Sequence, residues 1–395
     1  MHPHLRQKQR HSLLEDSSAY NKLVFNKNRN EAQDHSTLMD EAAGLFRYED
    51  CKDEYWNPEA FSLLYGTPLW HQASASQRVI LNQLYWVAYY AQIISAEIAT
   101  IYLNQVSAAG LYTHEDFRIV CDALDLESRQ ERAHINTFKT IGEEVEWCLF
   151  GERLFTFPMR SLYEQTMVFA DTNVAKAFWR NLQIRAFTLL SSSNAFLASQ
   201  YLLVRGLRTL NGKLIQHQLS NYYSQHADRD NAPAPSKISY YHFMDESFHF
   251  NTSKIIGHEI PRSLEPPTAF ETWIVNRAVW GCQKDHYHFS AAIKGIFWYE
   301  PALFPVLYKI FRSSHFGMTD SEAKDMLRQC FAIENEAIHQ SFALHRTAVE
   351  SYKAYVDSIA YLAAGNHAMT VMSGNTISKY LERNVKALRN FKGVA

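Results

Sequence analysis

The amino-acid sequence predicts an all-α protein built as a helical bundle, and three observations support this fold class. Long segments place apolar residues three and four positions apart, which is the pattern of helices that bury one face. Glycine and proline are nearly absent from these segments. No run of alternating apolar and polar residues bounded by turns suggests a strand. Helices of the predicted lengths are usual in bundles whose helices cross the whole domain.

The predicted elements follow one another with polar connections between them. Residues 1–54 are polar and show little periodic pattern, so we expect a partly disordered or peripheral arm there. Residues 55–395 are expected to form a single domain that opens with short apolar runs bracketed by turns. Helices are predicted over residues 76–106, 113–150, 174–210, 238–256, 267–294, 300–312 and 320–364. The last three form a C-terminal helical extension packed on the central bundle.

Composition and charge exclude several classes of function. The net charge is −2, with 39 Lys and Arg against 41 Asp and Glu, so no basic surface for nucleic acid is indicated. The five cysteines form no C-x-x-C pair, which argues against a disulfide framework or thiolate zinc site and favours a reducing, cytoplasmic location. The N-terminal segment lacks the apolar core of a signal peptide. Polar residues interrupt the most apolar stretch, residues 187–204, so we expect a buried helix there and no membrane span.

The most informative motif is Glu-x-x-His, which occurs at Glu131–His134 and at Glu246–His249. Residues at i and i+3 of a helix share one face, so a carboxylate and an imidazole can reach the same metal ion. A bundle that binds two metal ions needs two such helices, each paired with a helix that donates a further glutamate. Glu97 suits this role because it is an isolated acid in an apolar helical segment, where a bare carboxylate would be costly to bury.

A third histidine, His242, precedes Glu246 by four residues and therefore lies on the same helical stripe as the second motif. One Glu-x-x-His motif alone usually lies on a solvated face, but this combination predicts a dimetal centre. The nearby acids Asp125 and Glu127 are interpreted as surface residues. Carboxylate and imidazole ligands without thiolates favour iron, with manganese as the alternative, over structural zinc. The predicted ligands are Glu97, Glu131, His134, His242, Glu246 and His249.

These ligands, together with the aromatic run from Tyr55 to Trp70, resemble the para-aminobenzoate N-oxygenase family over residues 55–260. The extra histidine on the fourth helix distinguishes that family from ferritins and from ribonucleotide reductase small subunits. The resemblance implies a ferritin-like fold and a di-iron enzyme that activates dioxygen. The chain has no nucleotide fingerprint and no cysteine set for an iron–sulfur cluster, so the electrons must come from an external reductase or other donor.

The sequence departs from that family on the third helix, where the family places another glutamate. Residues 177–212 contain no Asp or Glu. The family's usual separation places the missing residue near Ser191, Ser192, Ser193 and Asn194. The loss of this carboxylate either weakens metal binding or admits another anion, for which chloride is the obvious candidate. We therefore interpret Ser191, Ser192 and Asn194 as catalytic candidates that shape a halide site, with close helix packing as the alternative explanation of the serine run.

A metal-bound halide is what radical halogenation of an unactivated C–H bond requires. The chain resembles in particular the dimetal-carboxylate halogenases, which chlorinate fatty acyl chains on acyl carrier protein in natural-product biosynthesis. This resemblance implies two irons, dioxygen and chloride as co-substrates, and an acyl substrate on a carrier protein or a small-molecule substrate; a homodimer is compatible with it. The alternatives are an N-oxygenase, hydroxylase or desaturase of the same family, and a non-catalytic metal-binding bundle.

A third Glu-x-x-His motif, Glu336–His339, is a further candidate for the missing ligand. Its position after the fourth helix favours a hydrogen-bonded or surface pair instead.

Overall fold

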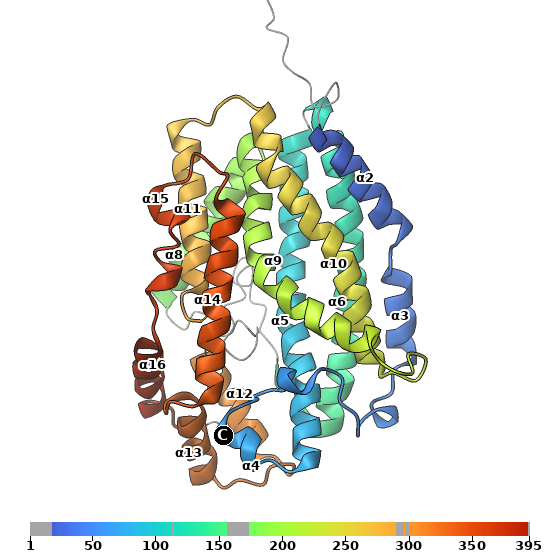
Figure 1. Ribbon diagram of the computed structural model, residues 1–395, viewed down its shortest axis with the longest axis vertical. Helices are drawn as coiled ribbons and strands as arrows, with labels where there is room; N and C mark the ends of the chain where they lie inside the picture. The colour runs from blue at the N-terminus through green and yellow to red at the C-terminus, as the bar shows by residue number, and fades with distance from the viewer. Residues whose placement is uncertain (1–17, 113, 156–173, 290–295, 297–299, 394–395) are drawn as a thin grey trace, which may run out of the picture.

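The computed structural model of the chain describes residues 18–112, 114–155, 174–289, 296 and 300–393 (Figure 1). Every regular element among these residues is a helix, which confirms the predicted all-α fold class. No helix in this part of the chain combines the length and hydropathy needed to cross a membrane.

Four long helices make up the centre of the molecule. Helix α5 pairs with α6 and helix α9 pairs with α10, and the two pairs meet through α5 and α9 (Figure 1). Helix α5 is buried around most of its circumference, as its apolar composition predicts, whereas α6 keeps a polar outer face. The bounds are α5 (Ala75–Tyr112), α6 (Arg118–Phe150), α9 (Ala195–Ser224) and α10 (Ala234–His258).

The N-terminal segment forms two helices, α2 (Ser18–Ala32) and α3 (Ser36–Leu45), which pack against α6 and α10. The sequence pattern did not indicate these two helices, although a peripheral arm was one of the two expectations. The reason is that polar side chains make the contact: Asn26 is buried, and its Nδ2 donates to Phe248 O on α10 at 3.0 Å. Half of the buried residues of α2 are asparagines, Asn26 and Asn30, and a hydropathy pattern does not reveal them.

Two of the predicted helices are each divided by a polar cap. The helix expected over 174–210 breaks at Ser192–Asn194 into α8 (Val174–Ser191) and α9, because the Asn194 side chain accepts from Leu197 N and caps α9. The apolar stretch 187–204 therefore spans this break. In the same way Asn335 divides the helix expected over 320–364, since its side chain accepts from Ile338 N. Small polar side chains bond to nearby backbone groups, which competes with continued helix.

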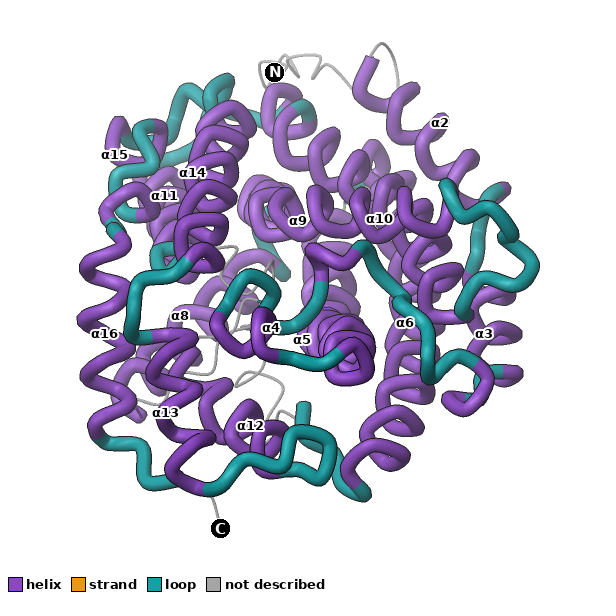
Figure 2. Tube along the Cα trace, turned by 60° about the horizontal axis from the view of Figure 1, so that its bottom comes forward, coloured by secondary structure: helices purple, strands orange, loops and turns teal. Residues whose placement is uncertain are grey.

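The C-terminal helices lie on the side of the bundle opposite α2 and α3 (Figures 1 and 2). Helices α11 and α14 pack directly on α9, around a buried cluster that includes Val279, Tyr352 and Val356. The C-terminal helices are α11 (Ala269–His286), α12 (Glu300–Arg312), α13 (Asp320–Phe331), α14 (Glu336–Val356), α15 (Ala364–His367) and α16 (Ile377–Arg389). The short helix α4 (Pro68–Gln72) precedes α5 and contacts α13.

Helices α9 and α10 approach closely where Gly257 lies against the backbone of Leu203. A Cβ at Gly257 would lie 2.8 Å from both N and Cα of Leu203, whereas a Cβ at Gly212 on α9 would meet only Tyr89 Oη, at 3.8 Å. The contact that places α10 is therefore a contact between two backbones.

We expect Gly257→Ala to destabilise the protein by about 1–3 kcal/mol, because the new methyl group forces α9 and α10 apart. Gly212→Ala is the matched control and should be neutral or stabilising by up to about 1 kcal/mol, since alanine favours a helix interior. Urea unfolding of the two variants measures both effects. Equal stability of the two variants would show that the close approach does not constrain the fold.

Candidate metal centre

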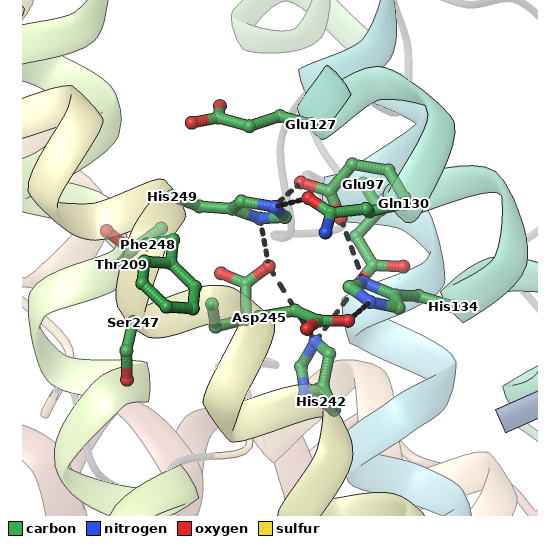
Figure 3. A network of polar contacts seen from close by, with 12 residues as sticks. Glu97, Glu127, Gln130, His134, Thr209, His242, Asp245, Ser247, Phe248 and His249 are labelled. Carbon is green, nitrogen blue, oxygen red and sulfur yellow. Dashed lines mark hydrogen bonds and ion pairs between the residues drawn. The ribbon is translucent and has the colours of Figure 1, made fainter. Parts of the chain in front are cut away.

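The structure brings all six predicted ligands together in the middle of the bundle. Glu97 comes from α5, Glu131 and His134 come from α6, and the others come from α10. Five of the six are buried, and the Glu246 side chain is 13% exposed. Figure 3 shows side chains from the three helices turned toward one another.

The ligand atoms form two groups, and within each group all atoms lie within 4.8 Å of one another. Glu246 belongs to both groups, as expected of a ligand shared by two metal ions. The first group is Glu97, His134, His242 and Glu246, and the second is Glu131, Glu246 and His249. The arrangement is that of two adjacent metal positions, of which the second has fewer ligands.

The contacts show which nitrogen of each histidine faces the metal positions. His249 Nδ1 lies 2.7 Å from Glu246 Oε1, and His134 Nδ1 lies 3.3 Å from Glu131 Oε2. His242 instead presents Nε2, which lies 3.1 Å from Glu97 Oε1. The second oxygen of Glu97, Oε2, is buried and has no hydrogen-bond partner among the described residues. A buried carboxylate oxygen without a partner fits a metal ligand.

The clustered carboxylates of Glu97, Glu131, Glu246 and Asp245 create a demand for positive charge. Burial, reinforced by the charge of Glu131, holds the pKa of Glu97 well above its ordinary value. Burial alone would lower the pKa values of His134 and His249, but the surrounding carboxylates outweigh it and hold them well above 6.5. Burial and the charge of His134 lower the pKa of His242 to about 3. Protons on His134 and His249 thus supply the positive charge that bound metal ions would replace.

Two residues that sequence reasoning missed hold the outer nitrogens of the histidines. Asp245 Oδ2 lies 3.2 Å from His134 Nε2, and Gln130 Oε1 lies 2.9 Å from His249 Nε2. Such partners fix the tautomer and the orientation of a metal-binding imidazole. The available signal was position: each residue directly precedes the glutamate of a Glu-x-x-His motif.

Glu127 is buried, so its interpretation as a surface acid was wrong, whereas Asp125 is exposed as expected. Glu127 forms an ion pair of 2.8 Å with Arg205 of α9. It lies one turn before Glu131 on the same helix face, and that spacing could have revealed its position. Figure 3 shows Glu127 on the same side of the centre as His249.

Ser191, Ser192 and Asn194 are not brought to this cluster. Ser191 packs closely against Gly110 of α5, so that a Cβ on Gly110 would overlap the backbone oxygen of Ser191. Ser192 is exposed. Gly110 is about 20 Å along α5 from Glu97, from the rise of 1.5 Å per residue. These residues end α8 and cap α9, so the serine run forms a helix junction away from the six ligands.

Two contacts show which part of α9 faces the ligands. Arg205 Nη2 donates to His249 O at 3.1 Å, and the rings of His217 and Phe243 lie with their centroids 5.5 Å apart. The two helices run in opposite directions, so the stretch of α9 between these contacts faces the turn of α10 that carries the ligands.

That stretch of α9 contains small residues and no acid. Thr209 is partly buried, and Gly212 is buried with room for a Cβ. The third central helix therefore offers no carboxylate where it faces the ligands, and Thr209 and Gly212 lie in this stretch.

The third motif takes no part in the centre. Glu336 and His339 are exposed at the start of α14, and His339 Nε2 contacts Glu334 Oε1 at 2.8 Å. Both residues lie on the surface, but they do not pair with each other, since Glu336 Oε1 accepts from Gln340 Nε2 at 2.6 Å.

The family comparison covers nearly the whole described chain. A family model for acyl halogenases, described as CylC-like, matches residues 18–392. This range includes α2, α3 and all six ligands, and it extends well beyond residues 55–260. No curated protein and no solved structure matches the chain.

We expect Glu246→Ala to abolish binding at both metal positions, because Glu246 is the ligand they share. Glu336→Ala removes the glutamate of the exposed Glu-x-x-His motif and should leave binding unchanged. Anaerobic titration of the metal-free variants with ferrous iron, followed by metal analysis, measures the stoichiometry. Retention of two irons by Glu246→Ala would contradict the assignment.

Proposed function

Because this chain belongs to the CylC-like acyl halogenase family, we propose that it is a di-iron enzyme that uses dioxygen to replace a hydrogen of an unactivated C–H bond with chlorine. The substrate is an acyl chain, carried on an acyl carrier protein or presented as a small molecule. Manganese is the alternative metal. The electrons come from an external donor.

One observation supports halogenation above the other reactions of a dimetal centre: the stretch of α9 that faces the ligand-bearing turn of α10 carries no acid. The candidate carboxylate ligands therefore come from α5, α6 and α10 alone. A ligand position left open on the side of α9 can bind an anion from solution, and chloride is the anion that halogenation requires.

The open coordination lies at the second metal position. The second metal position has three candidate ligands, which leaves coordination positions open to exogenous groups. On α9, facing the ligand-bearing turn of α10, Thr209 and Gly212 supply no carboxylate and leave volume. When bound, the two metals would activate dioxygen and hold the halide. Residues of the chain around the centre orient the protein ligands and shield the metal positions from water.

Aromatic rings supply much of this shielding on the side of His242. The ring of Phe138 lies edge-on to that of His242 with centroids 4.9 Å apart, and Tyr90 does the same at 5.5 Å. Both rings are fully buried. A dry, apolar wall favours a reaction in which a carbon radical must meet a halide before water.

The direct test is to incubate the iron-loaded enzyme with dioxygen, a reductant, chloride and a fatty acyl chain on a carrier protein, and to analyse the acyl chain by mass spectrometry. We expect exchange of one hydrogen for chlorine, seen from the mass gain and the chlorine isotope pattern. The free fatty acid, tested in parallel, distinguishes the carrier-bound from the free substrate. Gain of a single oxygen without halogen would replace this proposal by the hydroxylase alternative.

Gly212→Glu should supply the missing carboxylate and so divert chlorination toward hydroxylation, changing the product ratio by about tenfold or more, equivalent to about 1.4 kcal/mol. Gly212→Ala fills part of the same volume without charge and should keep the wild-type ratio. Product ratios measured over a range of chloride concentrations separate the two variants. An unchanged ratio in Gly212→Glu would refute the α9 position of the vacancy.

A further inference from the structure

The two Glu-x-x-His motifs hold each other's histidines by a reciprocal arrangement. Asp245, just before the α10 motif, accepts from His134 of the α6 motif. Gln130, just before the α6 motif, accepts from His249 of the α10 motif. The two halves of the centre are therefore related by an approximate symmetry that interchanges α6 and α10. The symmetry is incomplete, because one half uses a carboxylate and the other an amide.

The N-terminal helices complete both halves. Asn30, near the end of α2, is buried and exchanges two hydrogen bonds with Gln130, of 3.0 and 2.8 Å. His35, at the start of α3, places Nδ1 2.8 Å from Asp245 Oδ1. The two residues are five positions apart, so one short connection between α2 and α3 reaches both halves of the centre.

The hydrogen bonds around Gln130 allow its side-chain amide only one orientation. Gln130 Nε2 donates to Asn30 Oδ1, so Gln130 Oε1 faces His249 and accepts from its Nε2. With the proton held on Nε2, the lone pair of His249 Nδ1 is directed at the second metal position. Without Asn30, the amide of Gln130 could reverse and present an N–H group to the imidazole.

The three histidines consequently differ in their outer environment. A carboxylate behind an imidazole raises its basicity as a ligand more than a neutral amide does. His134 has the carboxylate of Asp245, His249 has the amide of Gln130, and His242 Nδ1 has no partner among the described residues. The first position thus combines four ligands with the carboxylate branch, which is Asp245 and His35 behind His134. The second combines three ligands with the amide branch, which is Gln130 and Asn30 behind His249.

We propose that α2 and α3 act as an outer clamp on the metal centre, in which Asn30 and His35 are positioning residues, and that the amide branch makes the second metal position the weaker and more exchangeable one. The clamp rests on the metal-binding part of the proposed function and is independent of the reaction catalysed. A position with weaker protein ligation is also the one at which an exogenous anion can join the metal.

The test is stepwise titration of the metal-free full-length protein with ferrous iron in the absence of oxygen, by calorimetry. We expect two steps in the wild type. Asn30→Ala should weaken the second step by about 10–100-fold with little effect on the first, and His35→Ala should weaken the first step instead. Asn28→Ala, an exposed asparagine on the same helix, is the matched control and should change neither step.

A gain of affinity separates positioning from general damage to the fold. Gln130→Glu places a carboxylate behind His249 and should tighten the second step by about tenfold, a result that structural disruption cannot produce. Thermal unfolding of each metal-free variant shows whether it is folded. Two outcomes would overturn the clamp alone. In the first, the wild type shows two steps but Asn30→Ala and His35→Ala bind iron as Asn28→Ala does. In the second, Gln130→Glu has a weakened second step. No iron binding by the wild type would overturn the proposed function as well.

Discussion

The burial of a cluster of carboxylates in the middle of a helical bundle is the constraint on which the rest of the structure depends. Uncompensated anions in such surroundings are too costly to keep, so the surroundings must supply cations or protons. Histidines close to Glu97, Glu131 and Glu246 meet the demand, and Arg205 meets it for Glu127. Arg205 also bonds to Asn104 on α5 and Ser253 on α10, so one charge-compensating side chain ties together all four central helices.

Much of the centre was predictable because metal ligation and helix geometry impose the same spacing. Glu131 and His134 had to be three residues apart to share a face, and an isolated acid such as Glu97 needed a partner. Arg205 gave no comparable signal. It lies on another helix, and its pairing with Glu127 depends on the register of α9, which contains no acid to mark the position facing the metals.

Prediction from the sequence failed where hydrogen bonds of polar side chains, and not the spacing of apolar residues, determine the helix ends. The segment 174–210 has an apolar helical pattern on both sides of the break, yet α8 ends at Ser191 and Asn194 caps α9. The count from His134 by the family's usual separation led to this break, and Ser191, Ser192 and Asn194 lie away from the ligands for that reason. The N-terminal helices were missed for the opposite reason: Asn26 and Asn30 are buried but look like surface residues. Hydrogen bonds between helices, unlike apolar contacts, leave no trace in a hydropathy pattern.

The volume beside Gly212 has a consequence for how such enzymes diversify. Some glycine codons differ from glutamate codons by a single base. A helix that leaves this space for a mobile anion and one that fills it with a fixed carboxylate are therefore neighbours by one mutation. Because a Cβ at Gly212 meets only Tyr89 Oη at 3.8 Å, the backbone has room for the start of a side chain at this position. Under the proposed function, a single nucleotide change would therefore separate two oxidative chemistries on the same scaffold.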